Sequence, residues 1–220
     1  MAITASNLTT NGSASSGTTY STASITPIAG ALILVSISSA TFTPTVTIAG
    51  CNITWNQVAT VVNDQARLTV FRGLASSPTT DTIDLTFSSS AERVTWSVDQ
   101  FKSIDISNAG AAAVVQSATN NSNNATTLTA TLSAFANINN ATFGAIGTNG
   151  QSDLSAVTAG TGFTELADTV VGTSFKTGIE TEFRSDNDTT VNGSWTGSSP
   201  RATVIGIEIK FGQPFMGAMI

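Results

Sequence analysis

Hydrophobic residues recur at every second position in several segments of this chain. In residues 201–210, Ile205, Ile207 and Ile209 share one face, while Glu208 and Lys210 lie on the other. Alternation with a period of two is typical of a strand with one buried and one solvated face, as in antiparallel sheets. The same alternation occurs in residues 82–87, 92–99, 128–132 and 191–195. Residues 31–37 are apolar on both faces and predict a central strand.

Turn-forming clusters such as Ser76-Ser77-Pro78 separate these segments, and no window of ten residues or more has an amphipathic helical pattern. No fixed-period repeat is evident, which excludes a solenoid or propeller. We therefore predict an all-β fold, an antiparallel β-sandwich or jelly roll of about a dozen strands with negligible helix. The length fits one large β domain or two small ones. Because no linker interrupts the middle of the chain, we expect one domain over residues 18–210.

The two ends differ from the middle. Residues 1–17 are rich in Ser, Thr, Gly and Asn and predict an N-terminal arm, and the polar segment 117–127 predicts a loop. Residues 211–220 form an uncharged apolar tail that should pack against something. It either folds back over its own sandwich or clasps a neighbouring subunit. The assembly residues would then be Phe211, Pro214, Phe215, Met216, Met219 and Ile220.

Composition removes several classes of function. The chain has 40% hydrophobic and only 10% charged residues, against roughly 25% charged in ordinary domains. Without His, histidine-based catalysis and His-ligated metal sites are excluded, and Cys51 alone cannot form an internal disulfide. A net charge of −6 with eight Lys and Arg does not suit a phosphate backbone, so we expect no nucleic-acid partner. We expect no cofactor.

The termini and the longest apolar run bear on location. No positively charged and apolar leader follows Met1, so a signal peptide is not expected. The apolar run at residues 27–35 is far shorter than the roughly 20 residues that span a bilayer, so we expect no membrane span. We expect synthesis in the cytoplasm without export by the usual route.

Two acidic motifs are the candidates for chemistry. Glu180 and Glu182 share one face of a strand, as paired carboxylates do in retaining glycosidases, but the segment lacks the third acid of the strand motif of sandwich glycosidases. We interpret the pair as a solvated face balanced by Arg184 and Lys176 and expect no catalytic residue. Asp186 and Asp188 supply alternating oxygen ligands for calcium, without the downstream Glu of a full loop. A tight turn is the favoured interpretation of these two residues.

The three Trp residues are candidates for stacking on sugars. Trp96 alternates in phase with Val94 and Val98, and Trp195 with Val191, so both are expected in the core. Trp55 has no such phase and is the candidate glycan contact.

Five short stretches carry a resemblance to a known kind of protein: residues 67–73, 94–98, 114–119, 160–166 and 205–210. Through these stretches the middle and end of the chain resemble a sandwich module that recurs in proteins of tailed phages and environmental viruses. The resemblance covers about residues 20–210 and consists of the hydrophobic pattern and these short segments, without a catalytic motif. It implies a concanavalin-type or jelly-roll sandwich used as a capsid decoration, a tail-associated adhesin or a binder of surface carbohydrate.

Together these observations predict a non-enzymatic virion structural protein, a capsid decoration (cement) subunit that stabilises the particle by protein–protein contacts. Its partners would be other virion proteins (the major capsid protein or the tail) and copies of itself, and it would assemble in the host cytoplasm. The alternatives are a carbohydrate- or receptor-binding module of a phage tail, which contacts host polysaccharide, and a subunit of a bacterial surface filament, located extracellularly.

Overall fold

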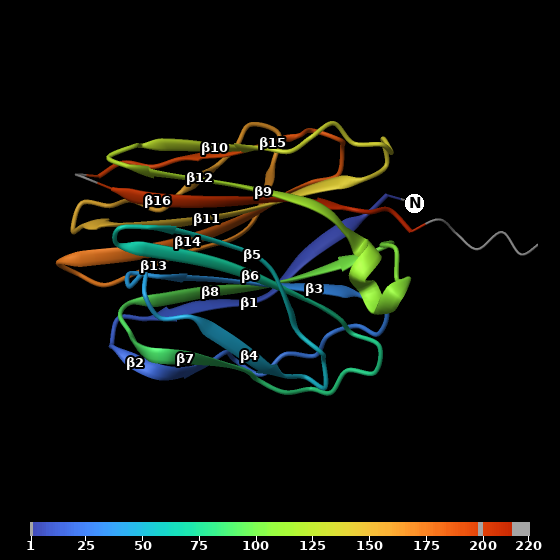
Figure 1. Ribbon diagram of the computed structural model, residues 1–220, viewed down its shortest axis with the longest axis horizontal. Coiled ribbons are helices and arrows are strands. Elements are labelled where there is room, and N and C mark those ends of the chain that lie inside the picture. The colour runs from blue at the N-terminus through green and yellow to red at the C-terminus, as the bar shows by residue number, and fades with distance from the viewer. Residues whose placement is uncertain (1, 198–199, 213–220) are drawn as a thin grey trace, which may run out of the picture.

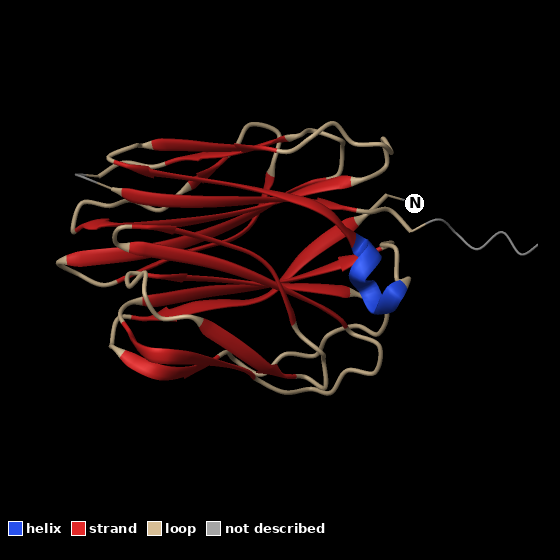
Figure 2. Cartoon of the chain, in the orientation of Figure 1, coloured by secondary structure: helices blue, strands red, loops and turns tan. Residues whose placement is uncertain are grey.

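The computed structural model describes residues 2–197 and 200–212, and nearly all of its regular structure is strand (Figures 1 and 2). The strands of the first half are β1 (Thr4–Ser13), β2 (Gly17–Ser21), β3 (Leu32–Ser39), β4 (Val46–Gly50), β5 (Asn56–Asn63), β6 (Ala66–Leu74), β7 (Ile83–Ala91) and β8 (Val94–Lys102). A short 3₁₀ helix, η1 (Asn108–Ala113), leads into the second half. Its strands are β9 (Val114–Asn123), β10 (Thr127–Thr131), β11 (Ala141–Gln151), β12 (Thr158–Ala159), β13 (Thr164–Val171), β14 (Phe175–Arg184), β15 (Thr190–Ser194) and β16 (Arg201–Ile209).

The strands form four stacked sheets (Figure 1). The outer layers are three-stranded, with the orders β2-β7-β4 and β10-β15-β12, and the two inner layers are five-stranded. The inner orders are β1-β8-β3-β6-β5 and β13-β14-β11-β16-β9, and every ladder is antiparallel. The prediction of an all-β antiparallel sandwich is confirmed, although the described residues form sixteen strands rather than about a dozen.

The second half repeats the topology of the first. Counted from the start of each half, the inner sheet has the order 1-8-3-6-5 and the outer sheet the order 2-7-4 in both. This is the wrapping of a jelly roll, except that the fifth strand pairs with the sixth at the edge of the inner sheet. Even a local irregularity recurs, because a bulge lies between Gln57 and Ala59 and another between Glu165 and Ala167. The region expected to be one sandwich is therefore a pair of jelly-roll halves.

The two halves pack through their five-stranded sheets, like the subunits of a symmetric dimer. β3 faces its equivalent β11 at the centre, β8 lies against β14, and β6 lies against β16. At the edges β1 lies against β13 and β5 against β9. This order of contacts is the one that an approximate twofold axis produces when it lies between the inner sheets and runs parallel to the strands. Such an axis relates one half to the other, and equivalent residues of the two halves therefore lie at the same end of the molecule.

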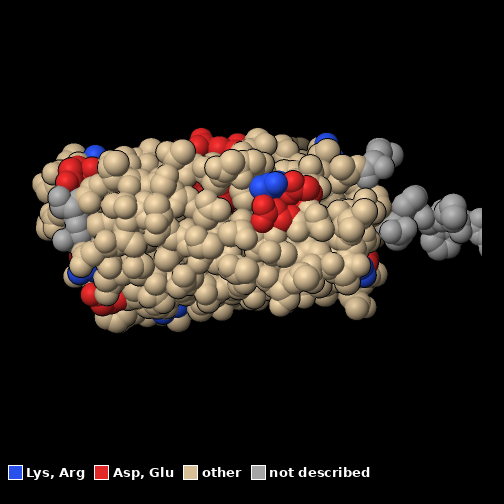
Figure 3. All heavy atoms as spheres, turned by 90° about the horizontal axis from the view of Figure 1, so that it is seen from above, with Lys and Arg blue, Asp and Glu red and all other residues tan. Residues whose placement is uncertain are grey.

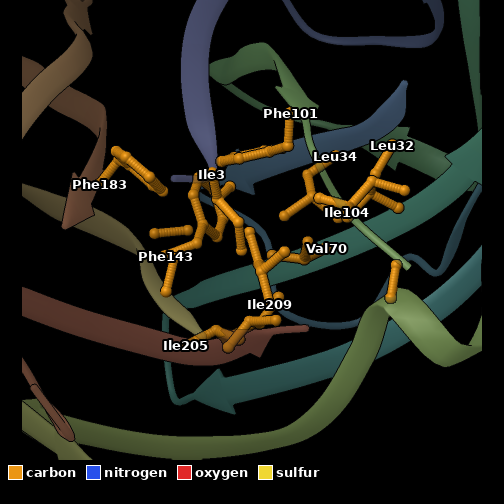
Figure 4. Packing of buried hydrophobic residues seen from close by; sticks show 14 of the residues in the cluster. Ile3, Leu32, Leu34, Val70, Phe101, Ile104, Phe143, Phe183, Ile205 and Ile209 are labelled. Atoms are coloured by element: carbon orange, nitrogen blue, oxygen red, sulfur yellow. The ribbon is translucent and has the colours of Figure 1, made fainter. Parts of the chain in front are cut away.

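Three hydrophobic cores hold the four layers together, one between each neighbouring pair of sheets. In β3, Leu32 and Leu34 point into the core shared by the halves, while Ile33 and Val35 point to the outer sheet. This explains why the central strand is apolar on both faces. In the shared core the Phe101 ring of the first half meets rings of the second, with centroids 5.5 Å from Phe143 and 5.8 Å from Phe183 (Figure 4).

Two segments differ from the sequence-based predictions. Residues 4–13 of the expected N-terminal arm form strand β1, paired with β8, and much of the expected loop at 117–127 belongs to β9, paired with β16. β1 and β9 are equivalent edge strands of the two inner sheets. Both can be strands with few apolar residues, because ladder hydrogen bonds hold their backbones and their side chains are exposed or only partly buried.

Candidate functional site

The seam between the inner sheets is apolar toward one end and polar toward the other. At the polar end small hydroxyl side chains and glycine replace Leu, Ile and Phe, and the side chains involved are fully buried: Ser36, Ser38, Thr95 and Thr203. A Cβ built on Gly147 would lie 2.7 Å from Ser38 Oγ and 2.8 Å from Thr203 Oγ1. The two halves therefore approach each other too closely there for any side chain on Gly147.

A cavity of about 580 Å³ lies beyond this polar end, between the two halves. Its volume lies within the range of small-molecule sites. Both halves supply its walls, which consist of Ala40, Gln65, Glu92, Arg93, Asn149, Gly150, Gln151, Phe175 and Arg201. We refer to these nine residues as the seam cavity and take it as the candidate functional site.

Arg93 stands at the entry to β8 in an unusual conformation. Its φ of 45° is in the left-handed region, which few residues other than glycine adopt without cost. The guanidinium lies 5.7 Å from the centroid of the Phe175 ring, and Nη1 lies 3.3 Å from Glu92 Oε2. Among the described residues, Arg93 Nε is buried without a hydrogen-bond partner. The first half thus presents a positioned guanidinium to the cavity.

Arg201 opens β16, the strand equivalent to β8, and lines the same cavity. Its Nε donates to Asp64 Oδ1 at 2.9 Å, and its side chain is 20% exposed. The approximate twofold arrangement therefore places two arginines, one from each half, around a single hollow. The sequence contained a signal for this pair, since Arg93 and Arg201 begin matching Arg-x-Thr segments that end at Lys102 and Lys210.

Amide side chains complete the seam cavity. Asn149 is 5% exposed, and its Nδ2 donates to the Gln65 backbone oxygen at 2.8 Å. Its Oδ1 accepts from Thr177 Oγ1 at 3.2 Å, so its orientation is set from both sides. Gln65 and Gln151 are exposed at the rim, each with an amide able to donate and to accept.

A buried polar network also crosses the seam. Asp99 on β8 accepts from Asn7 Nδ2 and from Ser97 Oγ, each at 2.9 Å. Ser97 Oγ lies 3.1 Å from Thr181 Oγ1 of the second half. Burial raises the pKa of Asp99 to about 6, although the hydrogen bonds from Asn7, Ser97 and Thr181 lower it in part. The network ties the two halves together through a carboxyl that has no cationic partner among these contacts.

The interpretation of Glu180 and Glu182 as a solvated face is wrong. Both side chains have 0% exposure, because β14 is a strand of an inner layer and its second face lies under the outer sheet. Arg184 pairs with Asp186 and Asp188 instead of balancing the glutamates, and Lys176 Nζ donates to the Leu154 backbone oxygen at 3.1 Å. The alternation of the segment was recognised, but a four-layer stack buries both faces.

Only part of this carboxyl pair is satisfied by hydrogen bonds. Glu182 Oε2 accepts from the Gly160 backbone N–H at 2.7 Å, whereas both oxygens of Glu180 lack a partner among the described residues. Burial raises the pKa of Glu180 far above the ordinary carboxyl range, and the charges of Glu182, Glu165 and Asp168 raise it further. Burial also raises the pKa of Glu182, and the N–H groups of Gly160 and Asn192 oppose that rise.

Asp168 lies opposite Glu180 in the β13–β14 ladder. Burial raises its pKa to about 6, and the charge of Glu165 adds to the rise. Burial among other carboxyls, without a hydrogen-bond partner in the described residues, favours the protonated form of Glu180. A glycosidase acid pair must touch its sugar, and the sealed Glu180 and Glu182 offer no such contact.

The calcium candidate forms a turn held by an arginine. Arg184 Nε lies 2.5 Å from Asp186 Oδ1, and Arg184 Nη1 lies 2.8 Å from Asp188 Oδ2. The backbone N–H of Thr190 donates to Asp188 Oδ1 at 2.8 Å, as in an Asx turn. In the described part of the chain, no three His, Cys, Asp or Glu side chains are grouped so that they would hold a metal ion.

Trp55 is half-buried and lines a shallow hollow with Ile48 and Thr54. Its Nε1 donates to the Gly50 backbone oxygen at 3.3 Å, and its ring passes within 3.0 Å of the position that a Cβ on Gly73 would take. One face of the indole is thus covered by its own sandwich. Trp96 and Trp195 are each 4% exposed, which confirms their expected place in the core.

Phe211 is the first residue of the predicted assembly tail. It forms a β-bridge with Ile104, its N–H donates to Asn140 Oδ1 at 3.0 Å, and it packs against the shared core. At this position the chain folds back on its own domain, one of the two expected arrangements. The other tail residues lie outside the described part: Pro214, Phe215, Met216, Met219 and Ile220.

No helix in residues 2–197 and 200–212 is long and apolar enough to cross a membrane. Comparisons with family models, curated proteins and solved structures find no match to this chain.

Proposed function

We propose that this chain is a non-enzymatic structural protein of a virus particle, a decoration subunit that binds neighbouring capsid proteins. The observation that carries the proposal is the chemistry of the outer sheets. On the sheet β10-β15-β12 the exposed side chains are hydroxyls and amides without a single charge, and they include Thr127, Thr129, Thr131 and Ser194. On the opposite outer sheet, Asp84 is the one charged strand residue.

Such a face suits association with another protein. Charged side chains are depleted at the centre of protein interfaces, because a charge loses its hydration when it is covered. Hydroxyl and amide groups cost less free energy to cover, because their hydrogen bonds to water can be replaced by hydrogen bonds to the partner. Figure 3 shows the molecule from the side of β10, β12 and β15, where most of the surface is free of Lys, Arg, Asp and Glu apart from a mixed cluster of basic and acidic atoms right of the centre and acidic atoms along the upper edge. We assign the particle contact to this face.

The rigidity of the molecule supports the same role. Three cores and four layers hold the two halves as one body, so the outer face is presented without a hinge between the halves. A decoration subunit acts mechanically, and a rigid body transmits load between its neighbours. The tail beyond Gly212 would add a second contact to a neighbouring subunit.

The test uses particles from which the native chain has been removed and to which recombinant chain is added. Thr129→Lys combined with Thr131→Lys places two charges on the proposed contact face without changing a buried residue. We expect the double variant to lose at least about tenfold in particle binding. The control, Ser77→Lys, adds a charge at an exposed turn and should bind as the unmodified chain does.

A second arm tests the tail. Truncation after Gly212 keeps the bridge between Ile104 and Phe211 and should weaken particle binding while the domain stays folded. If the double Lys variant and the truncated chain both decorate particles as well as the unmodified chain, the proposal is wrong.

A further inference from the structure

The seam cavity combines features that a purely structural protein does not need. It lies at one end of the seam where both jelly-roll halves contribute walls, and its volume is about 580 Å³. The backbone of Arg93 is held at φ 45° at its edge. Strained backbone persists where the surrounding structure enforces it, and such positions concentrate at binding sites.

The cavity offers guanidinium groups to an anionic ligand, although Arg93 already lies 3.3 Å from Glu92 and Arg201 lies 2.9 Å from Asp64. Its walls carry two guanidinium groups, Arg93 and Arg201, and one carboxylate, Glu92. Asp64 engages Arg201 from outside the lining. Guanidinium groups bind carboxylates in a planar, bidentate arrangement, and each has five N–H donors.

The remaining walls favour a ligand rich in hydroxyl groups. The amides of Gln65, Asn149 and Gln151 lie around the hollow, and an amide matches a hydroxyl because both donate and accept. Phe175 is 52% exposed, and Arg93 covers its ring from one side at 5.7 Å. An exposed aromatic ring packs well against the C–H face of a sugar, where it buries apolar surface that water would otherwise contact.

Much of the site is fixed in advance. Asn149 is held by the Gln65 backbone and Thr177, and the Arg93 guanidinium lies over Phe175. A site that is ordered before binding loses less conformational entropy when the ligand arrives.

We propose that the seam cavity binds a saccharide unit that carries a carboxylate. The carboxylate lies between Arg93 and Arg201, the hydroxyls meet the amides, and one face of the ring packs on Phe175. The ligand touches both halves, so the site exists only in the paired jelly rolls. This inference goes beyond the proposed particle contact, because the seam cavity and the β10-β15-β12 face consist of different residues.

Titration calorimetry of the full chain with D-glucuronate, D-glucose and acetate tests the inference. We expect saturable binding of glucuronate that is at least about tenfold tighter than that of either glucose or acetate. Arg201→Gln should lower glucuronate affinity at least about tenfold, and Phe175→Ala should weaken it roughly three- to tenfold. Arg72→Gln is the matched control, because Arg72 lines a separate hollow near η1, and it should bind as the unmodified chain does.

Unchanged thermal midpoints would show that each variant is folded, since Arg201 and Phe175 are partly exposed. The inference is overturned if the unmodified chain shows no saturable heat with glucuronate, or if Arg201→Gln binds it equally well. Equal affinity for acetate and glucuronate would also overturn it, because a bare carboxylate site would need neither the amides nor the ring. None of these outcomes depends on particle binding.

Discussion

Gly147 of the second half lies against Ser38 of the first, with 2.7 Å between Ser38 Oγ and the position of a Cβ on the glycine. The contact is at the polar end of the seam, where β3 and β11 face each other. It sets how closely the two jelly-roll halves approach and therefore shapes the cavity beyond.

Gly147→Ala should destabilise the whole chain. The added methyl would meet Ser38 Oγ and Thr203 Oγ1 at distances that real Cβ atoms do not adopt, so the inner sheets would have to separate locally. Overpacking of this kind costs about 1–3 kcal/mol, which urea unfolding would detect. Gly150→Ala on the same strand is the control, because its nearest contact would be 3.5 Å away. Equal stability of the two variants would show that the halves are not in close contact at Gly147.

The buried carboxyls should make the protein less stable as the pH rises. A carboxyl whose pKa is raised by folding holds a proton in the folded state that the unfolded chain has released. Its contribution to stability is therefore complete below the ordinary carboxyl pKa and is lost as the pH passes the folded value. For Asp99 and Asp168 the loss extends to about pH 6, and for Glu180 it continues into the alkaline range. Thermal midpoints measured from pH 5 to pH 9 should fall steadily.

Glu180→Gln should remove much of this pH dependence. Glutamine has nearly the same shape but does not ionise. The variant should therefore melt at least about 3 °C higher than the unmodified chain at pH 8, and the difference between their melting temperatures should be much smaller at pH 5. Glu92→Gln, at an exposed glutamate, is the control and should leave the pH profile unchanged. A profile of Glu180→Gln parallel to that of the unmodified chain would mean that Glu180 is not buried in the protonated form.

Asn7→Ala should weaken the connection between the halves. Asn7 Nδ2 donates to both Asp99 Oδ1 and Ser97 Oγ at 2.9 Å, and its loss leaves a buried carboxyl short of a donor. The expected cost is about 1–3 kcal/mol in urea unfolding, with the pKa of Asp99 displaced further upward. Asn11→Ala on the same strand removes only an exposed contact to the neighbouring Gly12 and should change stability by less than about 0.5 kcal/mol. Equal effects of the two substitutions would contradict the network.

The sequence pattern correctly predicted the fold class but did not predict the number of layers. Alternation correctly located strands such as β16, and the run at 31–37 correctly indicated the central β3. The same rule misplaced Glu180 and Glu182, because it assigns the polar face of a strand to solvent, as in a two-layer sandwich. In a four-layer stack the polar face of an inner strand is also covered.

The internal repeat was missed for a related physical reason. Equivalent positions in the two halves are mostly occupied by different residues. Trp55, just before β5, corresponds to Phe163, just before β13, and Trp96 in β8 corresponds to Val204 in β16. Packing requires a similar volume and polarity at each position rather than the same residue. The seam cavity was not predicted either: Arg93 and Arg201 begin matching segments of the sequence, but the two side chains come together only when the halves pair.

The central claim is that this chain is a component of a virus particle, and its location can be measured directly. Particles would be purified from the culture or community that carries this sequence, analysed by mass spectrometry and imaged by electron microscopy. We predict that the chain is present in amounts stoichiometric with the major capsid protein, with density for paired jelly rolls on the particle surface. Recovery of the chain in the soluble fraction, with none on the purified particles, would contradict the claim.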